Sequence, residues 1–249
     1  MAEIPKSHPR YWSLKTREKI SEGLKKGWVH ETGLIAHGRG EAFDYLMGET
    51  TIPPAVEAEK VAAALLLNAD SAVISVNGNV VALAAEECVS LSEAADAKVE
   101  VNLFHRTSER VENLADALRD AGADRVYGLE GDASIPGLEH DRGLCDKDGI
   151  FSADVVFVPL EDGDRCQALK KMGKTVVAVD LNPVSRTAKT ADVTIVDNVV
   201  RALPNIQENV EKFKDKKDKQ LEELFEGWDN HRNLQSVLDV ISKRLNSMF

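Results

Sequence analysis

Between residues 56 and 197, short runs of apolar and mostly β-branched residues alternate with segments of helical periodicity. This alternation is typical of a mostly parallel sheet, because each parallel strand must be followed by a crossover, usually a helix, that returns the chain to the same end. The runs are nearly continuous in apolar character, as expected for strands buried on both faces. The predicted strands are 72–76, 99–104, 125–127, 155–158, 175–179 and 193–196. The pattern therefore predicts an α/β fold of the doubly wound class, with helices on both faces of the sheet.

Segment 107–123 has the clearest helical pattern between two of these strands. Thr107 or Ser108 is a suitable N-cap, apolar residues recur on one face, and Gly122 follows the last turn.

An N-terminal helix is predicted over residues 8–26, HPRYWSLKTREKISEGLKK. It is entered through Pro9, whose missing N–H has no helical partner in the first turn. Arg17 shares one stripe with Leu14, Ser21 and Leu24. Because an unpaired buried charge is costly, Arg17 must extend to solvent, pair with a carboxylate or point into a ligand cavity.

Two further helical patterns follow the sheet, one from Ile206 to Leu224 and one from Leu234 to Leu245. They predict a C-terminal helical hairpin. Its apolar stripe must cover the sheet domain or a second subunit, since a lone hairpin buries too little surface to be stable, and a homodimer contact is favoured.

The charge of the chain argues against nucleic-acid binding. The 249 residues carry a formal net charge of −11, whereas nucleic-acid binders concentrate Lys and Arg. An anionic ligand must therefore meet a local basic pocket. Cys88, Cys145 and Cys166 show no metal-binding spacing, and neither a secretory signal nor a membrane-spanning run of about 20 apolar residues is present. We expect a cytoplasmic protein without membrane contacts.

Polar residues follow each predicted strand and should meet at one edge of the sheet. They are Asn77-Gly78-Asn79, His105-Arg106, the segment from Leu160 to Arg165, Asp180-Leu181-Asn182 and Asp197-Asn198. Ligands of doubly wound folds bind outside the carboxyl ends of the strands, so these tips predict a single crevice. The acidic turn of Glu161, Asp162 and Asp164 is suited to magnesium through water, but a solvated turn explains it better.

Several of these positions suit a nucleotide. Asp180 stands where a carboxylate would grip ribose hydroxyls, and Arg186 with Thr187 would suit phosphate oxygens. In residues 33–49, GLIAHGRGEAFDYLMGE, two glycines flank Arg39 and suggest a phosphate-cradling turn before a helix. Neither GxGxxG nor GxxxxGK[ST] is matched, and no HExxH or GxSxG occurs.

The chain resembles the archaeal 4-phosphopantoate–β-alanine ligase family, also called phosphopantothenate synthetase. The resemblance rests on IPKSHPRYWSLKTREKI (4–20), GLIAHGRGEAFDYLMGETTIPPA (33–55), ISVNGN (74–79), VNLFHR (101–106), VPLEDGDR (158–165), DLNPVSRTA (180–188) and DNVVRALPNI (197–206). It implies that ATP activates 4-phosphopantoate as an adenylate, which β-alanine then attacks to give 4′-phosphopantothenate and AMP. Mg²⁺, a Rossmann-like sheet and a homodimer are also implied.

The resemblance also implies the residues of the ATP site. They are Arg17, Arg39, Asp180, Leu181, Asn182, Arg186, Thr187, Asn198 and Val199. For phosphopantoate, we nominate His37, Asn77, Asn79 and Arg106, which are polar, lie at predicted strand or loop tips and are not assigned to ATP. No residue is assigned a catalytic role, and the long polar loop 129–150 has no assigned function.

We expect a single ligase domain over residues 1–249. It consists of an N-terminal helical, ATP-contacting segment (1–55), a Rossmann-like core (56–200) and C-terminal helices (201–249). Two alternatives are kept: a nicotinamide-dependent oxidoreductase, which the missing glycine fingerprint disfavours, and a non-enzymatic adenine-nucleotide sensor.

Overall fold

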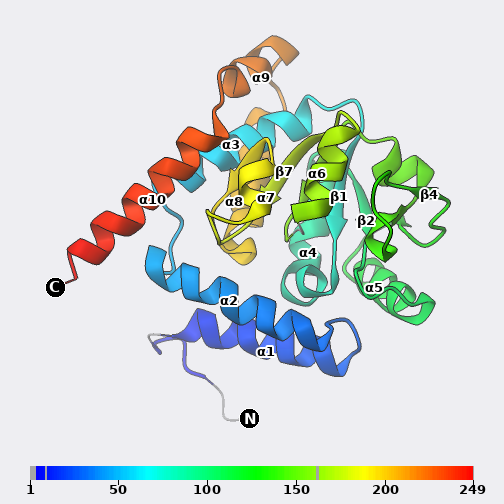
Figure 1. Cartoon of the computed structure of the whole chain (residues 1–249), viewed down its shortest axis with the longest axis horizontal. Helices are drawn as coiled ribbons and strands as arrows, with labels where there is room; N and C mark the ends of the chain where they lie inside the picture. The colour runs from blue at the N-terminus through cyan, green and yellow to red at the C-terminus, as the bar shows by residue number, and fades with distance from the viewer. Residues whose placement is uncertain (1–3, 9, 161–162, 249) are drawn as a thin grey trace.

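A parallel sheet forms the centre of the computed structural model, which describes residues 4–8, 10–160 and 163–248 (Figure 1). Its strands are β1 (Ala72–Val76), β2 (Lys98–Val101), β3 (Val126–Tyr127), β6 (Val155–Val158), β7 (Thr175–Val179) and β8 (Val193–Ile195). The order β3-β2-β1-β6-β7-β8 and the parallel pairing of every neighbour confirm the doubly wound prediction. The strand order reverses between β1 and β6, where such folds bind ligands.

Side chains alternate between the two faces of the sheet, as the pleat requires. Ile74, Phe157 and Val177 belong to the larger apolar cluster, whereas Val73 and Val156 belong to the smaller one. The larger cluster includes residues of α3 (Pro53–Leu67), α4 (Gly78–Ala94), α5 (Ser108–Asp120) and α8 (Val199–Phe213). The smaller one includes residues of α6 (Gly163–Lys171), which packs beside α7 (Arg186–Thr190), and of the segment 133–153. Helices on both faces are therefore confirmed.

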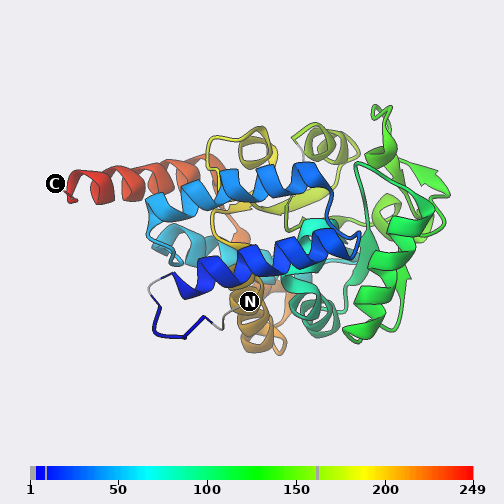
Figure 2. The same ribbon diagram turned by 90° about the horizontal axis from the view of Figure 1, so that it is seen from below.

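Two N-terminal helices, α1 (Tyr11–Lys25) and α2 (Glu31–Met47), run side by side in opposite directions (Figures 1 and 2). The N-terminal helix is confirmed, although Pro9, its predicted entry, lies outside the described residues. The predicted inward stripe is wrong, because α1 buries Thr16, Ile20 and Gly23 while Arg17 is exposed. Gly23 sets this rotation: a Cβ there would lie 2.6 Å from the Cβ of Ala82 on α4.

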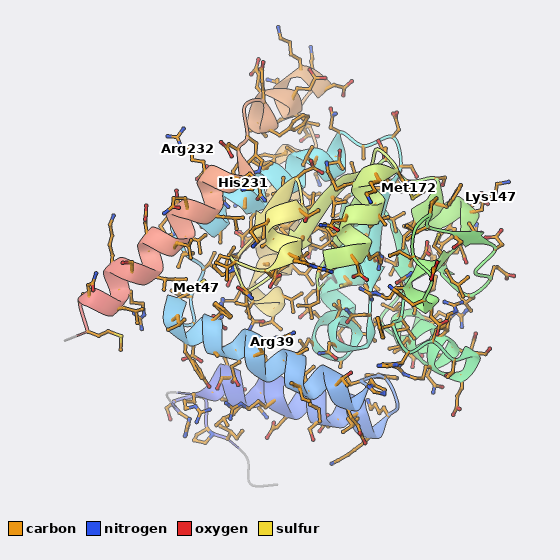
Figure 3. All side chains as sticks on the ribbon, viewed as in Figure 1. Arg39, Met47, Lys147, Met172, His231 and Arg232 are labelled. Atoms are coloured by element: carbon orange, nitrogen blue, oxygen red, sulfur yellow. The ribbon has the colours of Figure 1, made fainter. Side chains whose placement is uncertain are left out.

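The phosphate-cradling turn predicted around Arg39 is wrong, since residues 31–47 form one continuous helix. His30 caps its N-terminus, and Gly48, with φ of 91°, ends it. Arg39 lies about midway along α2 and Met47 near its end (Figure 3). Gly33 of α2 permits close packing instead, because a Cβ there would lie 2.3 Å from the side-chain oxygen of Asn79.

The C-terminal helices are confirmed, with the first pattern divided into α8 and α9 (Asp218–Phe225) ahead of α10 (Asn230–Asn246). Their apolar residues cover the chain's own core, since α8 packs on α3 and α4 and α10 contacts α2 and α3. The far end of α10 projects from the body (Figure 1), where Leu245 is 41% exposed. Across the described part of the chain, no helix combines the length and apolar character needed to cross a membrane.

The loop 129–150 folds back against the sheet. It contains a short antiparallel pair, β4 (Ala133–Ser134) and β5 (Leu144–Cys145). The buried carboxylate of Glu100 on β2 accepts hydrogen bonds from the backbone N–H groups of Asp146 (3.0 Å) and Ile150 (2.6 Å). Burial raises the pKa of Glu100 to about 7, although these two N–H groups lower it. The segment is thus anchored by backbone contacts rather than left as a free loop.

Candidate active site

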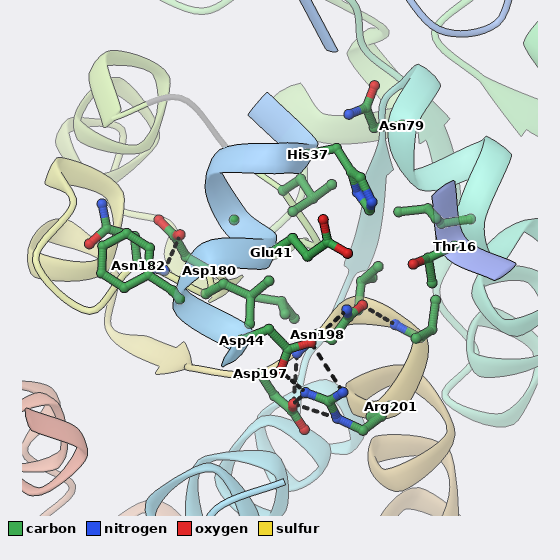
Figure 4. A pocket seen from close by; sticks show the side chains of 18 of the residues that line it. Thr16, His37, Glu41, Asp44, Asn79, Asp180, Asn182, Asp197, Asn198 and Arg201 are labelled. Carbon is green, nitrogen blue, oxygen red and sulfur yellow. Dashed lines mark hydrogen bonds and ion pairs between the residues drawn. The ribbon is translucent and has the colours of Figure 1, made fainter. Parts of the chain in front are cut away.

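A cavity of about 1340 Å³ lies where α2 faces the carboxyl ends of the central strands (Figure 4). The segments that follow four of the strands line it, as predicted, whereas the predicted pair His105-Arg106 after β2 does not. They contribute Asn77 and Asn79 after β1, Leu160 after β6, Asp180, Leu181 and Asn182 after β7, and Asp197, Asn198 and Val199 after β8. From the N-terminal layer, α1 adds Thr16 and Lys19, and α2 adds His37, Arg39 and Glu41. The predicted single crevice is therefore present, and α2 forms its opposite wall.

The turn after β7 is held in place by Asp180. Its carboxylate accepts hydrogen bonds from the backbone N–H of Asn182 (2.9 Å) and from the hydroxyl of Ser185. Ser185 also caps α7, because its Oγ accepts from the N–H of Ala188 at 2.9 Å. Burial raises the pKa of Asp180, while the two hydrogen bonds and the charge of Arg39 act in the opposite direction. The turn is thus built before any ligand binds.

Two arginines of opposite walls line the cavity, Arg39 from α2 and Arg186 from the first turn of α7. The side chain of Arg186 is 66% exposed and lies 3.9 Å from Asp164, too far for a hydrogen bond. Both guanidinium groups are therefore available to an anion in the cavity. Thr187, the next residue of α7, also lines it.

A buried ion network joins α2 to the end of β8 (Figure 4). Arg201 donates to both oxygens of Asp44, at 2.6 and 3.2 Å, and through Nε to Asp197 at 2.9 Å. Asp197 also accepts from the hydroxyl of Thr51 at 2.6 Å, and the side-chain amide of Asn198 donates to Asp44 at 3.1 Å. The side chains of Asp44 and Asp197 are 6% and 0% exposed. This network fixes the N-terminal layer over the sheet and so sets the width of the cavity.

The sequence model of the phosphopantothenate/pantothenate synthetase family matches residues 54–244. The chain belongs to this family. The match extends from α3 into the last turns of α10 and includes every strand of the central sheet.

The chain is also similar to curated proteins named 4-phosphopantoate–β-alanine ligase. It is 53% identical to that of Thermococcus onnurineus over 249 residues, which cover 100% of this chain and 95% of the relative. It is 50% identical to that of Methanosarcina mazei over 248 residues, 100% of this chain and 98% of the relative. With the protein of Methanospirillum hungatei, it shares 60% identity over 203 residues, 82% of this chain and 83% of the relative.

Most residues that the sequence nominated for ATP come together in this family member. Arg39, Asp180, Leu181, Asn182, Arg186, Thr187, Asn198 and Val199 all line the cavity. Arg17 does not: it binds the carboxylate of Glu41, with Nη2 at 2.8 Å, and the hydroxyl of Tyr45 at 3.0 Å. Of the three placements considered for the Arg17 side chain, pairing with a carboxylate is the one observed.

The four residues nominated for phosphopantoate have different surroundings. His37, Asn77 and Asn79 line the cavity, whereas Arg106 lies outside it and donates to the backbone carbonyls of Gly128 (2.7 Å) and Leu129 (3.3 Å).

The two asparagines also shape the cavity wall. Asn77 caps α4 and donates to the carbonyl of Leu160 at 2.9 Å, while Asn79 donates to the carbonyl of Gly33 at 2.9 Å. Asn79 thereby ties α4 to the start of α2.

Sequence patterns did not reveal Arg201, Asp44 or Thr51 as parts of the site. The only local signal is the i, i+4 spacing of Asp197 and Arg201, which is common in helices. The acidic turn predicted at 161–164 is described only at Asp164, since Glu161 and Asp162 lie outside the described residues. Asp164 contacts His140, with Oδ2 3.1 Å from Nε2.

Proposed function

We propose that this protein is a 4-phosphopantoate–β-alanine ligase that forms 4′-phosphopantothenate, AMP and pyrophosphate during coenzyme A biosynthesis. The observation that carries the proposal, beside family membership, is the size and polarity of the cavity. Its volume is about 1340 Å³, whereas sites for one drug-sized ligand occupy about 300–1,000 Å³. There is room for a nucleotide beside a second phosphorylated acid, and Arg39 and Arg186 supply positive charge from opposite walls.

ATP is proposed to bind along the ends of β7 and β8. Asp180 would receive the ribose hydroxyls, while Leu181, Asn182, Asn198 and Val199 line the surface for the nucleoside. Arg39, Arg186 and Thr187 would contact the phosphates, since guanidinium groups and hydroxyls are suited to phosphate oxygens. Arg17 is proposed from the resemblance alone and would have to release Glu41 to take part.

Phosphopantoate is proposed to bind between α2 and α4, beside His37, Asn77 and Asn79. Arg106 is proposed by elimination alone, and its contacts with Gly128 and Leu129 give it a structural role at the β3 end.

The reaction follows from placing two anions together. An oxygen of the phosphopantoate carboxylate attacks the α-phosphorus of ATP and pyrophosphate leaves; the β-alanine amine then attacks the acyl carbon and AMP leaves. Positioning and charge stabilisation account for such a reaction without a protein nucleophile. The protein's part is to hold the reactants in line and to neutralise the phosphates with Arg39 and Arg186.

Mg²⁺ is proposed to enter with the nucleotide. Among the residues that the structure describes, no three His, Cys, Asp or Glu side chains gather to hold a metal ion. We therefore propose that Mg²⁺ is carried by ATP, because Mg²⁺ in nucleotide sites keeps several waters and is bound by substrate phosphates and only one or two carboxylates. When bound, it would supply charge neutralisation at the phosphates.

A homodimer in the cytoplasm is also proposed. The α1–α2 layer exposes Trp12 and Ile35, which are 75% and 72% accessible. The dimer rests on the family resemblance, and these exposed side chains are candidates for its contact surface. Sedimentation analysis of the purified chain should give twice the monomer mass of 27.3 kDa. A monomer at micromolar concentration would contradict the dimer.

The function is tested by product identification. The purified protein is incubated with ATP, Mg²⁺, 4-phosphopantoate and β-alanine, and we expect AMP, pyrophosphate and 4′-phosphopantothenate in equal amounts. Omission of either acid should abolish 4′-phosphopantothenate. Formation of ADP and phosphate would contradict the adenylate route, and an absence of all three products would contradict the ligase. A matched reaction with unphosphorylated pantoate shows whether the phosphate is recognised.

A further inference from the structure

The second chemical step of the proposed ligase needs a proton acceptor. An alkyl amine has a pKa of about 10.4 in the lysine side chain, so β-alanine enters near pH 7 as an ammonium ion with no lone pair for attack. One proton must leave before the C–N bond forms and the C–O bond to AMP breaks; the nitrogen then loses a second proton to solvent. A positioned general base contributes about 100- to 10,000-fold to such a step.

Four of the carboxylates that line the cavity are already engaged. Glu41 is bound to the guanidinium of Arg17, and Asp44 is bound to that of Arg201. Asp197 is also bound to the guanidinium of Arg201, and Asp180 accepts two hydrogen bonds from its own turn. A carboxylate held by a guanidinium is a weak base, and the Arg17 contact lowers the pKa of Glu41.

His37 is differently placed. It lies one helical turn before Glu41 on α2 and points into the cavity between Thr16 of α1 and Asn79 of α4 (Figure 4). Its Nε2 is enclosed and has no hydrogen-bond partner among the described residues. Nδ1 is not among the enclosed atoms without a partner, so it is the ring nitrogen assigned to a ligand.

The surroundings of His37 favour a neutral ring. Burial is the main cause that lowers its pKa; Glu41 on the same helix opposes this shift, and Arg17 of α1 adds to it. Lys15 and Lys19 of α1 and Glu87 of α4 are further charged groups that line the cavity on this side. A neutral imidazole with an available lone pair is the form that accepts a proton.

We propose that His37 is the general base of the second step and that its Nδ1 takes the proton from the β-alanine ammonium group. This inference rests on the proposed ligase function and deepens it. It assigns the amine substrate to the region between α1, α2 and α4, on the side of the acyl group opposite to the nucleotide.

The two half-reactions separate this role from binding. Phosphopantoate-dependent exchange of labelled pyrophosphate into ATP reports adenylate formation, and rapid mixing of the preformed adenylate complex with β-alanine reports the second step. Both are measured in the parent protein, in His37→Gln and in His231→Gln, a control on the exposed start of α10. The exchange reaction also shows that His37→Gln is folded.

Both half-reactions are compared at saturating 4-phosphopantoate, so that loss of a binding contact between His37 and that acid does not limit either rate. Under these conditions we expect His37→Gln to retain the maximal exchange rate within about threefold of the parent and to lose about 100-fold in the second step. Between the lowered pKa of His37 and the amine pKa of about 10.4, the second step of the parent should be nearly independent of pH, because His37 accepts the ammonium proton. In the variant the second step depends on the fraction of free amine, so its rate should rise about tenfold per pH unit across the same range. The proposal is overturned if the variant keeps the second step within threefold, loses exchange equally, or retains the parent pH profile. Absence of exchange in the parent would instead refute the ligase function itself.

Discussion

Replacing Arg201 with methionine should destabilise the protein strongly, because Arg201 neutralises two buried carboxylates at once. Removal of one partner of a buried ion pair costs about 3–5 kcal/mol. The side chain of Arg201 is 25% exposed, while Asp44 and Asp197 are 6% and 0% exposed. Solvent screening at the guanidinium places the expected loss at the lower end, about 3 kcal/mol. For a chain of this size, that loss lowers the melting temperature by roughly 6–12 °C.

Calorimetry and urea unfolding at pH 7 measure this loss, and two further variants test its cause. Arg201→Lys keeps the charge but lacks the planar fork that binds both carboxylates, so it should lie between the parent and Arg201→Met. In Asp44→Asn combined with Arg201→Met, the loss should be smaller than the sum of the single losses by about 1 kcal/mol or more. A loss under about 1 kcal/mol in Arg201→Met, or strict additivity in the double variant, would refute the network as the clamp of the N-terminal layer.

Four other changes test separate parts of the structure. Burial raises the pKa of Glu59 from 4.5 to about 8. Between these two pH values, Glu59 is protonated in the folded state but ionised in the unfolded state, so the stability of the protein falls as pH rises. Glu59→Gln should therefore gain stability over the parent by up to about 1.4 kcal/mol per pH unit across that window, measured by urea unfolding; a constant difference would contradict this. Gly38→Ala should stabilise α2 by about 0.5–1 kcal/mol without changing the KM for ATP, since nothing lies within 4 Å of the new Cβ. Gly78→Ala should lower the free energy of unfolding by at least about 2 kcal/mol, because its Cβ would lie 2.0 Å from the carbonyl oxygen of Trp28. Arg186→Ala should raise the KM for ATP about tenfold or more at unchanged melting temperature; an unchanged KM would remove Arg186 from the site.

The sheet and the position of the crevice could be predicted because they follow from local patterns. Buried parallel strands are continuous apolar runs, and the residues after them must share one edge of the sheet. Asp180 and Asn198 were found in this way, and both line the cavity.

Features that depend on contacts distant in sequence could not be predicted. Glycines normally signal turns, so Gly38 and Gly40 suggested a phosphate-cradling turn around Arg39. The helix α2 runs through both positions instead, and its Gly33 leaves room for the side chain of Asn79. Arg17 has its partner Glu41 on another helix, 24 positions along the chain, and Arg201 reaches Asp44 across 157 positions. The family resemblance identified Arg17 as a candidate for the ATP site, but only the packing of α1 on α2 shows that its guanidinium is held outside the cavity.

The oxygen balance of the reaction tests the adenylate mechanism most directly. With 4-phosphopantoate labelled by ¹⁸O in its carboxylate, attack on the α-phosphorus of ATP transfers one carboxylate oxygen to the nucleotide when the amine displaces AMP. We predict that mass spectrometry will find one ¹⁸O in each AMP released and none in pyrophosphate. Unlabelled AMP, or ¹⁸O in inorganic phosphate beside ADP, would contradict activation of the acid as an adenylate in this cavity.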